Sequence, residues 1–176
     1  MQGSTYNAMQ LLTKFFHTTG KIYPSSDSPL TLHAVFQDGK EVVGESHITN
    51  YTGMIDHVYV TNTFDQERPK ASKIVVEAIL ESDMVVLGPG SLFTSILPNL
   101  MIDEIGKAIL ETKAQVAYVC NIMTQRGETE HFTDSDHVAV LHKHLGEKFI
   151  DTVLVNINQV PAAYMNSNKF DEYLVQ

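Results

Sequence analysis

The stretch Met84-Val85-Val86-Leu87-Gly88-Pro89-Gly90-Ser91-Leu92-Phe93-Thr94-Ser95 joins a short apolar run to a Ser/Thr-rich helix start through two glycines. This order is typical of a buried strand followed by a strand-to-helix loop. Such a loop can bind an anion, because glycines let successive N–H groups point at one place and a helix start adds unpaired donors. A tight turn without a ligand explains the same glycines. The spacing matches neither common nucleotide fingerprint, since no Gly-Lys-Ser/Thr follows and Phe93 stands where G-x-G-x-x-G has its last glycine.

On both sides of this stretch, the sequence after Pro69 alternates between helical and strand-like segments. Apolar strands separated by amphipathic helices imply parallel pairing, with helices on both faces of the sheet. We therefore expect an α/β fold. The predicted helices are Lys70–Glu81, Pro98–Glu111, Asp134–Leu145 and a last segment from about Val160, and the predicted strands are Met84–Leu87, Gln115–Cys120 and Thr152–Val155.

The first third of the chain has a different pattern. Apolar residues predict a helix over Tyr6–Phe16, with Ser4 as its N-cap. Alternation over Leu30–Phe36, then Asp38-Gly39 and the run Lys40–Ile48, predicts a β-hairpin. We expect one domain over residues 1–176, with a helix and hairpin section (1–66) and a βα section (67–176), and the segment 61–69 is the best candidate for the boundary between them. A helix at the very start suggests that something precedes it in a longer protein.

Composition limits the classes of partner. The chain has 176 residues, is 43% hydrophobic and carries a net charge of −9 with only 12 Lys+Arg, so it can form a core but offers no basic patch for nucleic acid. No run approaches the roughly 20 apolar residues of a spanning helix, and the N-terminus lacks a signal-peptide layout, so we expect no membrane insertion. The single cysteine is compatible with a reducing cytoplasm.

Polar residues follow each predicted strand of the βα section. The first strand ends at Gly88–Ser91, the second at Asn121 and the third at Asn156. In an open parallel sheet, ligands bind beyond the carboxyl ends of the strands, so we expect these residues to share one rim. For each loop taken singly, a solvated loop that only caps the next helix is the alternative.

The loop after the second strand is the richest in chemistry. Its amides and hydroxyls can read donors and acceptors, Arg126 can bind a phosphate or carboxylate, and Glu128 can accept from a pair of sugar or ribose hydroxyls. We place a ligand phosphate at Gly90. The predicted ligand-binding residues are Gly88, Pro89, Gly90, Ser91, Thr94, Asn121, Thr124, Gln125, Arg126, Gly127, Glu128, Thr129 and Asn156.

Other polar groups have simpler explanations beside a functional one. Asp136 and His137 are weak candidates for acid/base groups, because capping of the helix that begins near Thr133 accounts for an acidic first turn. The eight histidines lack the spacing of a metal site, so we expect no structural metal. We interpret Cys120 as a small buried hydrophobe rather than a nucleophile. The segments 25–29 and 45–47 are turn or edge residues, or they project into a neighbouring cleft.

Several longer strings resemble one family. They are Gly88–Leu100, Tyr118–Gln125, Gly127–Thr129, Ser135–Val138, Gly44–Ile48 and Leu32–Val35. Together they are similar to the family of gluconeogenesis factors, within the superfamily of 2-phospho-L-lactate transferase. The resemblance spans nearly the whole chain. The family's N-terminal half, which carries a first glycine-rich loop and the first strands, has no counterpart in this sequence. It therefore implies that the chain is the C-terminal portion of a longer protein.

This resemblance implies a Rossmann-like three-layer sandwich with a mostly parallel sheet, and a cytoplasmic protein that affects cell shape and growth on gluconeogenic carbon sources. It implies binding of a UDP-sugar such as UDP-N-acetylglucosamine, which makes a non-catalytic regulator the first hypothesis. The second is a transferase that moves a phosphoryl-linked group from a nucleotide diphosphate donor, with Mg²⁺ and with Asp136 or His137 activating the acceptor hydroxyl. Because sheet neighbours would lie in the missing half, we also expect an unpaired strand edge that favours self-association.

Overall fold

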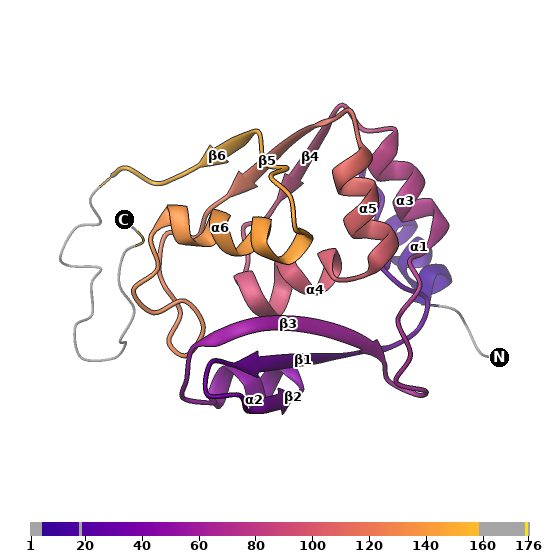
Figure 1. Cartoon of the computed structure of the whole chain (residues 1–176). Coiled ribbons are helices and arrows are strands. Elements are labelled where there is room, and N and C mark those ends of the chain that lie inside the picture. Colours follow the sequence, from indigo (N-terminus) through magenta and orange to yellow (C-terminus); the bar gives the residue numbers. More distant parts are fainter. Residues whose placement is uncertain (1–4, 18, 159–174, 176) are drawn as a thin grey trace.

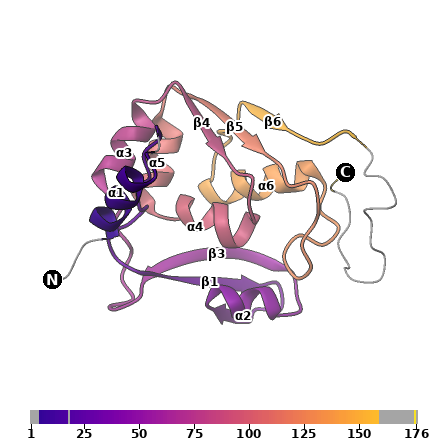
Figure 2. The ribbon, with the colours of Figure 1, turned by 180° about the vertical axis from the view of Figure 1, so that it is seen from behind.

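The computed structural model describes residues 5–17, 19–158 and 175, which form two sheets with helices between them (Figure 1). The parallel sheet has the order β4-β5-β6, and the antiparallel sheet has the order β2-β1-β3. Seen from both sides, α4 and α6 lie between the two sheets (Figures 1 and 2). The strands are β1 (Leu30–Phe36), β2 (Glu41–Val43), β3 (Ile55–Asn62), β4 (Met84–Leu87), β5 (Gln115–Val119) and β6 (Thr152–Leu154), and the helices are α1 (Thr5–Phe15), α2 (Glu45–Asn50), α3 (Lys73–Leu80), the π-helical turn η1 (Leu92–Ile96), α4 (Leu97–Leu100), α5 (Asp103–Glu111) and α6 (Asp134–Leu145).

The α/β fold with parallel βα units is confirmed. Val85 of β4 pairs with Val116 of β5, and Tyr118 of β5 pairs with Val153 of β6. The side chains of Val85, Tyr118 and Val153 face the helices and join the same buried cluster as the antiparallel sheet's Phe36. The two sections therefore fold around a common core.

The opposite face of the parallel sheet is less covered than the sequence predicts. Met84, Val86 and Leu154 alternate with the buried side chains and are 53%, 52% and 54% exposed. β4 is an edge strand of this sheet as described. The helices of the described residues therefore cover the inward side of β4, and its outward side remains apolar and half exposed.

The prediction of one helix over Pro98–Glu111 is wrong in detail. The helical path starts earlier, with η1 and then α4, and it breaks before α5. At the break, Ile102 has extended backbone angles (φ −80°, ψ 113°) and is fully buried. α5 then begins with Asp103 and Glu104, whose charges complement the start of a helix. Burial of Ile102 in the core accounts for the interruption that helical periodicity alone does not show.

The hairpin is confirmed only in its first part. β1 pairs with β2 in antiparallel register, and Asp38 accepts a hydrogen bond from the Lys40 N–H (2.9 Å) in the turn. The predicted strand Lys40–Ile48 is wrong beyond Val43, because Gly44 with φ 92° turns the chain into the short helix α2. α2 buries Ile48 completely, so this apolar residue belongs to a helix rather than a strand.

The remaining elements agree with the sequence except at their ends and at β3. β3 is absent from the sequence prediction, although its alternating buried residues include Val58 and Val60. α6 begins with a capping box between Thr133 and Asp136 and ends at Gly146 with φ 78°. The predicted N-cap Ser4 and the predicted helix from about Val160 lie outside the described residues.

Candidate functional site

The two glycines after β4 have different structural roles. Gly88 has φ 88°, and a Cβ there would lie 2.9 Å from the Val119 carbonyl oxygen, so the fold requires glycine at this position. At Gly90 a Cβ would lie 3.5 Å from Ser95 Cβ and 3.9 Å from Ile96 Cγ1, which are ordinary contacts. The fold therefore tolerates a side chain at Gly90, and glycine there leaves this part of the loop bare.

Asn121 joins the loop after β4 to the end of β5. The Gly90 N–H donates to Asn121 Oδ1 (3.2 Å), and Asn121 Nδ2 donates to the Gly90 carbonyl oxygen (2.9 Å). The side-chain amide thus binds the backbone of Gly90 at both of its polar groups. Because its N–H is already used, Gly90 approaches a ligand through its lack of a side chain rather than through a free donor.

Ser91, Thr94 and Glu128 form a compact hydroxyl–carboxylate cluster beside this loop. The Ser91 hydroxyl donates to Glu128 Oε2 (2.5 Å), and the Thr94 hydroxyl lies 2.6 Å from Ser91 Oγ and 3.4 Å from Glu128 Oε1. Ser91 precedes η1, yet its side chain bonds Glu128 instead of capping that helix. Ser91 and Thr94 therefore meet Glu128, which lies 37 and 34 positions further along the chain, as the shared rim predicts.

Glu128 is a buried carboxyl, only 4% exposed. Burial raises its pKa, the Ser91 and Thr94 hydroxyls act in the opposite direction, and the charge of Glu45 adds to the increase. A carboxylate at this place favours ligand hydroxyls, which donate, over a phosphate, which repels it. The cluster therefore suits the sugar or ribose part of a ligand.

The loop after β5 is packed rather than open. Thr124 and Thr129 are almost fully buried, and Thr129 Oγ1 accepts from the Gln125 N–H (2.8 Å). Gly127 has φ 77°, and a Cβ there would lie 3.1 Å from the Tyr51 carbonyl oxygen at the end of α2. Arg126 is exposed at the turn of this loop. Support of the loop by α2 could not be inferred from the sequence, because it depends on the helix that replaces the predicted strand.

Three residues that the sequence predicts for the site form their hydrogen bonds outside this cluster. Asn156 Nδ2 donates to the Asn158 carbonyl oxygen (2.9 Å), which closes a local turn after β6. Asp136 accepts from the Thr133 N–H (2.8 Å) in the capping box, and these bonds lower its pKa. His137 is fully buried, with Nδ1 2.8 Å from the Thr133 carbonyl oxygen. Helix capping and core packing account for Asp136 and His137.

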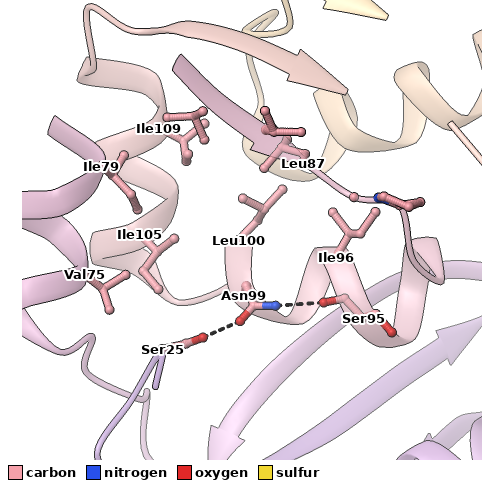
Figure 3. Close-up of a pocket in the computed structure, with 14 residues that line it drawn as sticks. Ser25, Val75, Ile79, Leu87, Ser95, Ile96, Asn99, Leu100, Ile105 and Ile109 are labelled. Carbon is pink, nitrogen blue, oxygen red and sulfur yellow. Dashed lines mark hydrogen bonds between the residues drawn. The ribbon is translucent and has the colours of Figure 1, made fainter. Parts of the chain in front are cut away.

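An apolar cavity of about 380 Å³ lies under the start of the glycine loop (Figure 3). Its polar end is formed by Ser25, Asn99 and Ser95, where Ser25 bonds Asn99 and Asn99 Nδ2 donates to the Ser95 carbonyl oxygen (2.8 Å). The rest of its wall is aliphatic: Val75, Ile79, Leu87, Ile96, Leu100, Ile105 and Ile109. This cavity is unsuited to a phosphate, so the hydroxyl–carboxylate cluster of Ser91, Thr94 and Glu128 is the better ligand site.

Potential metal ligands are scattered among the described residues. In that part of the chain, no three His, Cys, Asp or Glu side chains gather in a way that could hold a metal. Glu128 Oε2 accepts from the Ser91 hydroxyl while Oε1 has only the Thr94 hydroxyl at 3.4 Å, and Asp136 is engaged in its helix cap. Cys120 is buried, and burial raises the pKa of its thiol. None of the described helices is long and apolar enough to span a membrane.

Fold and site together define an α/β protein with a polar cluster at the carboxyl edge of its parallel sheet. A family model described as 2-phospho-L-lactate transferase CofD matches residues 1–175, so the chain belongs to the CofD family. This result confirms the superfamily to which the sequence strings point.

Relatives and solved structures agree with this assignment. The chain is 78% identical over 176 residues to a "Putative gluconeogenesis factor" from Streptococcus pneumoniae, covering 100% of this chain and 54% of that protein. It is 40% identical over 159 residues to a "Gluconeogenesis factor" from Bacillus subtilis, covering 90% and 49%. A crystal structure of a UPF0052-family protein from Bacillus halodurans superposes with a TM-score of 0.88 at 35% identity, covering 94% of this chain and 53% of that one. The chain spans about half the length of the curated relatives it matches.

Proposed function

We propose that this protein is a regulator that binds a nucleotide sugar, of which UDP-N-acetylglucosamine is the representative ligand. The observation that carries the proposal is the meeting of Gly90, Asn121 and Glu128 at the carboxyl ends of β4 and β5. In open α/β sheets this edge is where ligands bind. A bare glycine backbone lies beside a hydroxyl–carboxylate cluster, which provides close approach for one part of the ligand and acceptors for another.

Each part of the ligand has a chemical counterpart in the proposal. Glu128, Ser91 and Thr94 bind the hydroxyls of the sugar or ribose. The diphosphate lies over Gly90, away from the Glu128 carboxylate, and Arg126 is the cationic side chain of this rim that can reach it. Thr124, Gln125 and Thr129 hold the shape of the loop. Asn156, which follows the neighbouring strand β6, provides a further polar contact to the ligand.

The names of the relatives, gluconeogenesis factors, support a role in growth on gluconeogenic carbon sources. In this proposal, a cytoplasmic protein that senses a nucleotide sugar also links carbon supply to cell-wall synthesis, so its loss alters cell shape as well. No reaction is needed for such a role.

A second candidate is a transferase that uses a nucleotide diphosphate donor. The observation in its favour is the match of the family model described as a phospholactate transferase to residues 1–175. The described residues offer it little, because Asp136 and His137 are engaged in capping and core contacts and no metal cluster forms among them.

One experiment separates the two functions. The intact protein is incubated with UDP-N-acetylglucosamine, with and without Mg²⁺ and candidate acceptors, and the nucleotide is analysed by chromatography after separation from the protein. Recovery of intact ligand bound to the protein supports the regulator, and conversion to free nucleotide and a new product supports the transferase. Absence of both binding and conversion contradicts the proposal.

A further inference from the structure

A second polar cluster lies on the outer face of the antiparallel sheet, with one residue on each of its strands. Glu41 is on β2, His33 on β1 and Thr61 on β3. His33 Nδ1 lies 2.9 Å from Glu41 Oε1, and His33 Nε2 lies 3.0 Å from Thr61 Oγ1. A hydroxyl, an imidazole and a carboxylate are therefore connected in that order, which is the arrangement of an activated nucleophile, its base and the group that orients the base.

The hydrogen bonds determine which nitrogen carries the proton. Because the Glu41 carboxylate only accepts, His33 Nδ1 must be the donor to it. His33 Nε2 is then free to accept from the Thr61 hydroxyl. The Tyr59 hydroxyl also donates to Glu41, and its bond and that of His33 lower the pKa of this carboxyl, so Glu41 stays ionised. His33 is 7% exposed as a residue and its imidazole stacks on the Tyr59 ring (4.5 Å between centroids), so the ring orientation is fixed.

The hydroxyl of this cluster opens on a cavity. Thr61 lines a space of about 490 Å³ together with His57, Tyr59 and Gln66. The Gln66 side-chain oxygen lies 3.5 Å from Thr61 Oγ1, so its amide group is within reach of a molecule bound at Thr61. Gln66 has φ 62°, a strained backbone conformation for a side chain of this kind, and such strain is concentrated at functional sites.

The free edge of β3 adds a backbone donor to this cavity. The Val58 N–H donates to His144 Nε2 and the Asn62 N–H to the Glu67 carbonyl oxygen, both away from β1. Strand alternation places the Val60 N–H on the same side, and Val60 lines the cavity. The Gln66 amide and the Val60 N–H are thus the donors available to an oxygen that becomes negative during a reaction.

We propose that Glu41, His33 and Thr61 form an acyl-transfer centre for small esters. Thr61 Oγ attacks the ester carbonyl carbon while its proton passes to His33 Nε2. The bond to the alcohol oxygen breaks, the alcohol leaves with that proton, and the acyl group remains as an ester on Thr61. Water then attacks this ester, gives one proton to His33, and the carboxylic acid departs as the proton returns to Thr61 Oγ. Thr61 and His33 are catalytic residues, and Glu41 is a positioning residue.

The test uses p-nitrophenyl acetate with the intact protein. We expect release of p-nitrophenol together with one acetyl group on Thr61, located by peptide mass spectrometry. Thr61→Val removes this acetylation, Thr61→Ser keeps it, and His33→Gln slows it by about a hundredfold or more, the contribution of a general base. The matched control is Thr31→Val, since Thr31 faces Thr61 in the strand register and bonds Thr63 instead of the histidine.

Glu41 is tested by the kcat and KM of the same reaction. In Glu41→Gln the side-chain NH₂ can face His33 Nδ1, so the bond that orients the imidazole is lost; we expect kcat to fall by about tenfold or more with KM unchanged, and Glu41→Asp to restore part of the rate. Acetylation confined to lysines or the N-terminus, an equal rate in Thr61→Val, or an unchanged kcat in Glu41→Gln each overturns the proposal. Thermal melts of the variants show whether each one is folded.

Discussion

Asn121 binds Gly90 at both backbone groups, at 3.2 Å and 2.9 Å, across 31 positions of sequence. This pair fixes the loop after β4 against the end of β5 before any ligand arrives. Since ordering a loop on binding costs conformational entropy, a loop that is already held binds more tightly. The pair is thus the structural reason to place the ligand site at this edge.

Replacement of Asn121 tests the role of this pair. In Asn121→Asp the Gly90 N–H keeps an acceptor, but the donor is lost and a carboxylate faces the Gly90 carbonyl oxygen. We expect a loss of about 1–3 kcal/mol in the free energy of unfolding, measured by urea titration, and weaker binding of UDP-N-acetylglucosamine. Unchanged stability would show that the loop is held by other contacts.

Glu128 makes stability depend on pH in a definite direction. Because burial raises its pKa above the ordinary value of 4.5, the folded protein holds the proton more strongly than the unfolded chain. Its contribution is fully present below pH 4.5 and is lost as the pH rises through the folded-state pKa. Glu128→Gln removes this dependence, so urea unfolding at about pH 4 and about pH 8 should show a smaller decrease in the variant. An equal decrease in both proteins would contradict the assignment.

His144 makes the stability of the fold depend on pH in the opposite direction. Its Nδ1 lies 2.8 Å from the Val140 carbonyl oxygen and its Nε2 accepts from the Val58 N–H (3.2 Å), which requires a neutral ring. Burial lowers its pKa below 6.5, so stability is present above pH 6.5 and is lost as the pH falls through the lower folded-state value. His144→Gln should flatten the stability curve over this range. A curve as steep as that of the parent protein would rule out His144 as its source.

The exposed side of β4 predicts association of the 176-residue chain. Met84 and Val86 are apolar, half exposed and located on an edge strand, which favours pairing with other chains. We expect light scattering to show oligomers, and Val86→Lys to shift them toward monomer. A stable monomeric parent chain with a cooperative melt would contradict this expectation.

The βα units were predictable because their signals are local. Met84–Leu87 is a continuous apolar run that ends in glycines, and Thr133 with Asp136 is a capping pattern. The sequence reasoning does not predict β3 although its residues alternate, and it assigns α2 to a strand because Ile48 resembles the end of an apolar alternation. The positive φ of Gly44, at which the chain turns from β2 into α2, distinguishes a helix from a continued strand.

The candidate site was predictable in its position but not in its hydrogen bonds. Residues at strand ends share a rim in any open parallel sheet, so the meeting of Ser91 and Glu128 follows from topology. That Asn121 takes the Gly90 N–H, and that Asp136 closes a capping box, depends on side-chain rotamers that spacing does not determine. The sequence reasoning does not bring His33 and Thr61 together, because their contact depends on β3, which it does not predict.

Gly90→Ala tests the central claim most directly, because the structure has room for the added Cβ. We expect calorimetric titration of the intact protein with UDP-N-acetylglucosamine to show binding weaker by roughly 2 kcal/mol or more, because the added Cβ holds the diphosphate away from the loop and so costs it one or two charge-assisted hydrogen bonds to neighbouring groups. Gly20→Ala is the matched control, since a Cβ there meets nothing within 4 Å. Asn156→Ala should weaken binding less, and His142→Ala should leave it unchanged. Unaltered affinity in Gly90→Ala, with a melt like that of the parent, would show that the loop is only a tight turn and would contradict the proposed site.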